Sequence, residues 1–201
     1  MKTQEIKIGT IDEWLETDKE VANEIIESKR DINLEFNDWY EPIIEGFIED
    51  AADKGFEIST EDVQFTGFWS QGDGASFTGS INVIDFLRYH KKLSQFGALR
   101  RAIDNGYIDE IISIDRTSNH YSHENTCEVN GFEYYDDDMI TKLAEYQMEE
   151  VLGWLEEERV DMCKTLYRNL EEYYTELQED EAVIETLSVN EYEFNEFAEM
   201  A

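Results

Sequence analysis

The sequence is short of positive charge. Only 16 of its 201 residues are Lys or Arg, against 49 Asp or Glu, so the formal net charge is −33. Such a chain is not expected to bind nucleic acid or an anionic membrane directly, because both are polyanions and would repel it. The natural complement of this chain is a basic protein surface or a bound cation.

Cysteines and long apolar runs are also scarce. The two cysteines, Cys127 and Cys163, cannot form a disulfide framework or a zinc knuckle, and we interpret both as small, partly buried thiols. No run of 18 apolar residues is present, so no transmembrane helix is expected. The first residues lack the apolar segment of a signal peptide. Together these absences predict a cytoplasmic protein.

Breaks in the chain are equally rare. Pro42 is the only proline, and no Gly/Ser-rich linker is visible, so we expect residues 1–201 to form a single domain. Aromatic residues make up 13% of the chain. Disordered acidic tails are poor in aromatics, whereas this chain has enough of them to build a core.

The hydrophobic pattern predicts an α+β fold in three stretches. Residues 1–55 have apolar residues at helical spacing, and residues 136–201 form a long acidic helical region. Between them, from about residue 56 to 135, β-forming residues alternate and predict an antiparallel sheet of about four to five strands. A helical insertion at 83–105 interrupts this sheet, which is expected to pack against the N-terminal helices and the acidic helical region.

Individual elements can be assigned within these stretches. The helical pattern is clearest over 11–28, 38–53 and 138–177, and Gly153 could divide the last of these into two helices. Alternating patterns predict a hairpin and two further strands, with an edge strand near the C-terminus. The expected strands lie at 63–69, 75–81, 111–117, 121–129 and within 187–197.

The acidic helical region is the first candidate for a partner-binding surface. Residues 136–201 hold 21 acids and 4 bases, and two acids per helical turn would give one charge per roughly 2.7 Å. Double-stranded DNA carries one charge per about 1.7 Å of axis, so an array of phosphate-like carboxylates is feasible. The plain alternative is a solvated helix face. The candidate partner-binding residues are Glu149, Glu150, Glu156, Glu157, Glu158, Glu171, Glu172 and Glu176.

A basic segment at residues 88–101 contrasts with this acidic region. It contains no acid. It is expected either to pair with the acidic helices, which would lower self-repulsion, or to form a docking patch or anion site. We favour internal pairing. The basic residues and the histidine are Arg88, His90, Lys91, Lys92, Arg100 and Arg101.

A glycine-rich loop between the two predicted hairpin strands is a candidate ligand site. In the stretch 67–77, with the sequence GFWSQGDGASF, two glycines flank Asp73 and permit positive φ on both sides. Backbone N–H groups and polar side chains could then contact a ligand, or the glycines could serve only a tight turn. The loop is neither a phosphate-binding P-loop nor a dinucleotide fingerprint, and no cofactor is expected. The candidate ligand residues are Trp69, Ser70, Gln71 and Asp73.

A short histidine segment is the second local candidate. His120, His123 and Glu124 lie within five residues, and in a turn they could converge on a divalent metal. Their spacing does not match either zincin pattern. His123 is also a possible general base, with Glu124 and Asp73 as further catalytic candidates. The plain alternative is a polar sheet surface without a ligand.

The loop sequence and the histidine segment together carry a resemblance. The string GFWSQGDGASF at residues 67–77, followed by HYSHE at 120–124, resembles a group of small uncharacterised bacteriophage proteins. The resemblance implies a phage origin. The overall charge is separately similar to that of phage-encoded DNA mimics that block restriction or CRISPR machinery.

Two hypotheses follow for the function, beside the plain possibility of a halophile-type acidic surface without mimicry. The first is a non-enzymatic phage inhibitor that mimics nucleic acid and occupies the basic groove of a nucleic-acid-binding host defence protein. It would use the acidic helical region and bind no nucleic acid or membrane, and a homodimer stays open. The second is a small-molecule or nucleotide-binding protein, or a metal-dependent enzyme. It would use the Gly72-Asp73-Gly74 loop with His120, His123 and Glu124.

Overall fold

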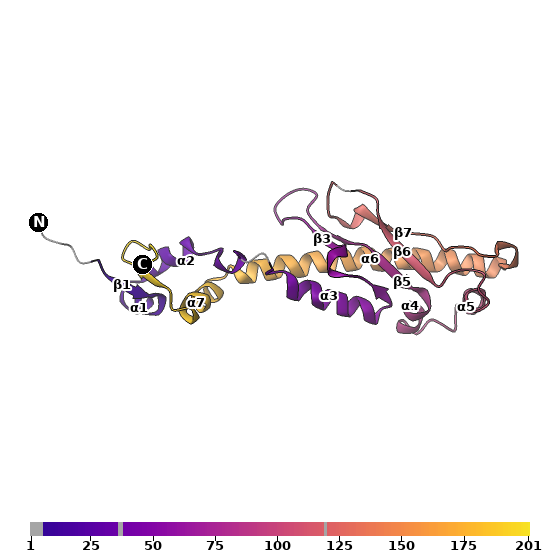
Figure 1. Ribbon diagram of the computed structural model, residues 1–201, viewed down its shortest axis with the longest axis horizontal. Coiled ribbons are helices and arrows are strands. Elements are labelled where there is room, and N and C mark those ends of the chain that lie inside the picture. Colours follow the sequence, from indigo (N-terminus) through magenta and orange to yellow (C-terminus); the bar gives the residue numbers. More distant parts are fainter. Residues whose placement is uncertain (1–5, 36–37, 119) are drawn as a thin grey trace, which may run out of the picture. The chain divides into compact units, whose positions relative to one another are not determined.

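The computed structural model describes residues 6–35, 38–118 and 120–201, and the fold is α+β (Figure 1). Two compact units are present. The terminal unit comprises Met1–Tyr40 and Glu171–Ala201, and the central unit comprises Glu41–Leu170. Residues 1–5 and 36–37 of the predicted helical stretch, and Asn119 of the histidine segment, lie outside the described residues. The expectation that residues 1–201 form a single domain stays a prediction.

The terminal unit combines helices from both ends of the chain. Where the sequence predicts one helix over 11–28, the structure has two, because Asp18 adopts an extended conformation with φ −149°. The Asp18 carboxylate then accepts the backbone N–H groups of Glu20 and Val21 and caps the second helix. The elements are β1 (Ile8–Thr10), α1 (Ile11–Thr17), α2 (Lys19–Ser28), a 3₁₀ turn (Ile32–Leu34), α7 (Asp180–Val189) and β8 (Glu193–Asn195).

A short antiparallel ribbon joins the two ends of this unit. β1 pairs with β8, which confirms the predicted edge strand near the C-terminus. The indole N–H of Trp14 lies 3.1 Å from the carbonyl oxygens of both Gly9 and Phe194, so the buried ring links the two strands. The core of the unit consists of Ile11, Trp14, Ala22, Ile25, Ile26, Ile32, Val183, Leu187 and Phe194.

The central unit contains a four-stranded antiparallel sheet and a separate two-stranded hairpin. The sheet has the strand order β2-β5-β6-β7, and the hairpin pairs β3 with β4. This arrangement agrees with the predicted antiparallel sheet. The sheet strands are β2 (Phe56–Glu57), β5 (Gly79–Asn82), β6 (Ile111–Arg116) and β7 (Cys127–Val129); the hairpin strands are β3 (Val63–Phe65) and β4 (Ala75–Phe77).

The predicted single strand at 75–81 is divided between the hairpin and the sheet. Its first part pairs with β3, and its second part, β5, pairs with β2 and β6. The division falls beside Gly79, whose φ is +149°. A Cβ at this position would lie 2.3 Å from the carbonyl oxygen of Glu57, so only glycine allows β5 to approach β2 this closely.

The helices of the central unit include one that is much longer than the others. α6 is a single helix of 36 residues, and Gly153 lies inside it without a break. Gly153 is exposed, and the buried residues Val151 and Leu155 on either side of it hold the helix in the core. The helices are α3 (Glu41–Asp53), α4 (Val83–Tyr89), α5 (Gly97–Asp104) and α6 (Lys142–Leu177), which extends past Leu170 into the terminal unit. Among the described residues, no helix is long and apolar enough to cross a membrane.

The predicted insertion at 83–105 consists of α4 and α5, and a buried glutamine fixes the start of α5. The side-chain oxygen of Gln147 accepts the backbone N–H groups of Ala98 at 3.0 Å and Leu99 at 2.9 Å. Its amide nitrogen donates to the carbonyl of Gln95 at 2.8 Å. Gln147 on α6 therefore replaces an N-terminal cap that α5 does not supply from its own sequence.

The predicted strand at 121–129 is wrong over most of its length. Only Cys127–Val129 forms a strand, and Glu124–Thr126 is a 3₁₀ turn. Side-chain hydrogen bonds explain the difference, since the Thr126 hydroxyl contacts the backbone N–H and carbonyl of His123. Such local bonds offer the backbone an alternative to sheet pairing.

Candidate functional site

The most unusual buried group of the central unit is Arg159, which is 1% exposed. Its Nε and Nη2 donate to the two carboxylate oxygens of Glu156 at 2.9 and 2.5 Å. Its Nη1 donates to the carbonyl of Glu124 at 2.7 Å. The guanidinium therefore joins α6 to the turn before β7, and its charge is balanced without access to solvent.

Burial disfavours the charge on Arg159, but its hydrogen bonds to Glu156 outweigh this and raise its pKa. At Glu156, too, hydrogen bonds outweigh burial. Burial raises the pKa of the carboxyl group, but the hydrogen bonds from Arg159 and from the backbone N–H of Val129 lower it by more, so the net pKa is lowered. Both groups are therefore held in their charged forms.

Both cysteines lie beside this guanidinium. The Nη1 atom of Arg159 is 3.1 Å from Sγ of Cys127 and 3.9 Å from Sγ of Cys163. Both thiols are free and buried, which agrees with the sequence interpretation. A hydrogen bond from the Cys163 thiol, together with the positive charge of Arg159, lowers the pKa of Cys127 to about 6 despite its burial. The same hydrogen bond raises the pKa of Cys163. The positive charge of Arg159 therefore favours the thiolate form of Cys127.

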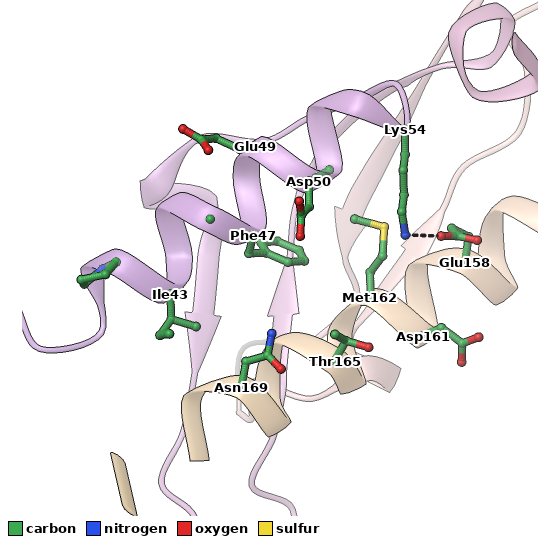
Figure 2. Close-up of a pocket in the computed structure, with 13 residues that line it drawn as sticks. Ile43, Phe47, Glu49, Asp50, Lys54, Glu158, Asp161, Met162, Thr165 and Asn169 are labelled. Carbon is green, nitrogen blue, oxygen red and sulfur yellow. Dashed lines mark hydrogen bonds and ion pairs between the residues drawn. The ribbon is translucent and has the colours of Figure 1, made fainter. Parts of the chain in front are cut away.

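A groove lies between α3 and α6 of the central unit (Figure 2). Its cavity volume is about 370 Å³, which is in the range of ligand pockets. Lys54 Nζ contacts Glu158 Oε1 at 2.6 Å at one end. Figure 2 shows Ile43 beside Asn169 at the other end, so α3 and α6 run in opposite directions along the groove.

The glycine-rich loop and the histidine segment meet in the structure. A Cβ on Gly72 would lie 3.6 Å from the ring of Tyr121, and one on Gly74 would lie 3.1 Å from Cα of His123. The Asp73 carboxylate accepts the backbone N–H groups of Trp69 at 2.9 Å and Ser70 at 2.6 Å. Asp73 therefore has the role of a turn residue, as the plain alternative predicts.

The other candidate ligand residues of this loop lie at its surface. Trp69 is 79% exposed, and Ser70 and Gln71 are exposed as well. The loop spans residues 66–74 between β3 and β4 and is longer than the five residues that the sequence predicts. None of these three side chains lines the groove between α3 and α6.

The proposed metal ligands do not converge. His123 Nδ1 lies 3.0 Å from Glu124 Oε2, and it also accepts the backbone N–H of Asn125 at 3.2 Å. His120 is exposed, and its backbone N–H contacts the Ser118 hydroxyl. Within residues 6–35, 38–118 and 120–201, no group of three or more His, Cys, Asp or Glu side chains could hold a metal ion.

The structure divides the eight candidate partner-binding acids into two classes. Glu156 and Glu158 form ion pairs with Arg159 and Lys54, so they are not unpaired acids as the other candidates are. Helical spacing explains both contacts, since Glu156 lies one turn before Arg159 and Glu158 faces the end of α3. Glu171 is half-buried. The exposed members are Glu149, Glu150, Glu157, Glu172 and Glu176.

Few acids of the chain are neutralised by internal pairing. Of the 49 Asp and Glu residues, 48 lie in the described part of the chain. Six of these have an oxygen within 4.0 Å of a Lys or Arg nitrogen, which leaves 42 without such an ion pair among the described residues. Most acids of the described chain therefore have no internal positive partner.

The basic segment at 88–101 does not pair with the acidic helices as expected. Arg88 and Arg100 each contact an Asp of their own helix. Only His90 approaches α6, with its Nε2 atom 3.9 Å from Glu158. Lys91 and Lys92 are exposed and make no ion pair with the residues that the structure describes. Local spacing of three or four residues, and not long-range attraction, decides these contacts.

The charge is also unequal between the two units. Residues 171–201 contain eleven acids and no Lys or Arg, and residues 1–40 contain eleven acids and five bases, so the terminal unit carries −17 over 71 residues. The remaining −16 is spread over the 130 residues of the central unit. The terminal unit is therefore about twice as dense in negative charge.

These features define an α+β protein with unpaired surface acids, a buried arginine–thiol cluster and a groove between two helices. The chain belongs to the family described as Domain of unknown function (DUF8835), which matches residues 39–180. That match includes the whole central unit. No curated protein and no solved structure matches the chain.

Sequence reasoning missed the arginine–thiol cluster, although a signal was present. Arg159 occupies a core position on the apolar stripe of α6, between Leu155 and Met162. A charged residue on a buried stripe is expected to have a charged partner nearby, and Glu156 is one helical turn away. The proximity of Cys127 to Cys163 had no such signal, because 35 intervening residues determine it.

Proposed function

We propose that this protein is a phage-encoded, non-enzymatic inhibitor that occupies the basic nucleic-acid-binding groove of a host defence protein of the restriction or CRISPR type. The observation that supports it is the set of 42 described acids without a Lys or Arg partner. Unpaired carboxylates at this number oppose compaction by self-repulsion. A positively charged groove would relieve that repulsion on binding.

The proposed mimicry depends on the overall negative charge of the protein and not on a spacing of acids that copies the phosphates of DNA. The ten acids of α6 are distributed along 36 residues, or one acid per about 5.4 Å of helix axis, which is sparser than the roughly 1.7 Å per charge of DNA. The exposed acids Glu149, Glu150 and Glu157 follow one stripe of this helix. The surface would therefore replace only part of the phosphates of a duplex.

The proposal has consequences for kinetics and location. Complementary charges accelerate association, and salt screens them, so binding is expected to be fast and to weaken as salt increases. The site of action would be the cytoplasm of the host cell, where such nucleic-acid enzymes operate.

The test compares two variants with the same net charge. Variant one carries Glu149→Gln, Glu150→Gln and Glu157→Gln, which removes exposed, unpaired acids. Its control neutralises three acids that already contact an arginine: Glu27→Gln, Asp85→Asn and Asp104→Asn. We expect the first variant alone to bind the captured basic partner more weakly. Equal affinity of both variants and the wild type would refute the assignment of this surface.

A second candidate is a small-molecule or nucleotide site where the glycine-rich loop meets the histidine segment. The contact of Gly74 with His123 supports it. Under this proposal, His123→Ala would abolish ligand binding or activity, and the acids of α6 would be dispensable. Asp73→Asn is the second variant. Its amide oxygen still accepts the N–H groups of Trp69 and Ser70, so the turn is kept while the carboxylate charge is removed.

A further inference from the structure

The groove between α3 and α6 has an uneven distribution of charge that the proposed function does not use. The half that lies toward the start of α3 is uncharged, with Ile43 and Phe47 opposite Thr165 and Asn169. Figure 2 shows Phe47 and the Met162 side chain directed between the two helices. This half therefore presents apolar side chains from α3 beside uncharged polar ones from α6.

The other half is acidic. Four carboxylates line it, those of Glu49, Asp50, Glu158 and Asp161, against the single ammonium group of Lys54, so its net charge is −3. Lys54 and Glu158 already form an ion pair at 2.6 Å. The other three acids have no Lys or Arg partner among the described residues, and Figure 2 shows Asp50 directed from α3 into the groove.

We infer that this groove binds a short peptide segment in which an apolar side chain is next to an arginine or lysine. The apolar side chain would lie on Phe47 and Met162, where its contact with water is removed. The cationic group would lie beside the Asp50 carboxylate, which Figure 2 shows directed into the groove, and a guanidinium could donate two N–H groups to its oxygens.

The chemistry of the groove excludes other classes of occupant. A purely apolar ligand would use only the uncharged half of the groove and would leave the acidic half without a partner. A nucleic acid or another anion would be repelled by the net charge of −3. A divalent metal needs several converging oxygens, and no such group exists among the described residues. A cation with an apolar part satisfies both halves of the groove.

The inference rests on the proposed function only in taking a basic protein as the source of the peptide. The groove acids Asp50 and Asp161 are different from the surface acids Glu149, Glu150 and Glu157, and each set can be changed alone. If the groove binds no peptide while the surface acids still control partner binding, this inference fails and the proposed function stands. If the groove binds the peptide while the surface acids have no effect on partner binding, the proposed function fails and this inference stands.

The experiment is a titration of the full-length protein with the blocked dipeptide N-acetyl-Leu-Arg-amide, followed by the amide proton–nitrogen correlation spectrum. The amide signals of Gly46, Ala51 and Thr165, which line the groove, report on occupancy. We expect them to shift and saturate. Replacing Arg by neutral citrulline, or Leu by Gly, should weaken binding about tenfold in each case, since each change removes one of the two recognised groups.

Variants of the protein provide the second arm. Asp50→Asn with Asp161→Asn should weaken dipeptide binding about tenfold, whereas the control pair Glu16→Gln with Glu24→Gln, which changes the net charge equally, should leave it unchanged. All four positions are exposed, and the spectrum itself shows whether the fold is kept. Equal weakening in both pairs, or shifts that do not saturate, would overturn the inference in favour of diffuse attraction. Equal binding of the citrulline peptide would do the same.

Discussion

The buried ion pair of Arg159 is the interaction on which the central unit should depend most. Changing Arg159 to Ala removes both hydrogen bonds to Glu156 and the one to the carbonyl of Glu124. It also removes the positive charge beside Cys127 and leaves a cavity where the side chain was. All of these losses occur at a position where the arginine side chain is only 1% exposed.

The magnitude follows from what each partner loses. Breaking a buried ion pair by removing one partner typically costs about 3–5 kcal/mol, because the remaining charge is uncompensated. The Glu156 side chain is 42% exposed and can regain part of its hydration. We therefore expect Arg159→Ala to lower the free energy of unfolding by about 3 kcal/mol, at the lower end of that range.

The assay is urea unfolding followed by circular dichroism, with Arg168→Ala as the matched control. Arg168 lies on the same helix but is exposed, and its removal should change the free energy by less than about 0.5 kcal/mol. A loss below about 1 kcal/mol for Arg159→Ala would refute the argument, since exposed pairs reach this value without any burial.

Three further predictions concern single positions. Gly153→Ala should stabilise the protein by about 1 kcal/mol in the same assay, because nothing lies within 4 Å of the added Cβ. Gly79→Ala should destabilise it by more than about 2 kcal/mol, since the Cβ would meet the Glu57 carbonyl. The pKa of Cys127 is lowered to about 6 in the folded protein, so ionisation of this thiol stabilises the fold. This contribution to the free energy of unfolding is complete above the ordinary thiol pKa of 9.0 and is lost as pH falls through 6. The ultraviolet absorbance of the thiolate should show this titration, and Cys127→Ser should remove it.

The α+β fold and its order of helices and strands were predictable from the hydrophobic pattern. The long periodic segment became α6, and the alternating segments became strands of antiparallel sheets. The prediction is wrong where a single residue overrides the pattern. Asp18 divides a predicted helix, Thr126 replaces a predicted strand by a turn, and Gly79 redirects a strand to a second sheet.

For the candidate site, the sequence predicted only the overall excess of acidic residues. The sequence shows that acids are in excess, but not which of them are occupied by bases, because Lys54 reaches Glu158 across 104 residues. The groove between α3 and α6 depends on the same long-range packing and had no local signal. In the glycine-rich loop, by contrast, the residues themselves indicated a turn, and Asp73 has that role.

The most direct test of the central claim is affinity capture of a partner from host lysate, with release by a salt gradient. We predict one basic nucleic-acid-binding protein that duplex DNA competes off the immobilised chain, and that binds the Glu149→Gln, Glu150→Gln, Glu157→Gln variant more weakly than its charge-matched control. A partner that DNA does not displace, or that binds both variants equally, would contradict nucleic-acid mimicry by this surface.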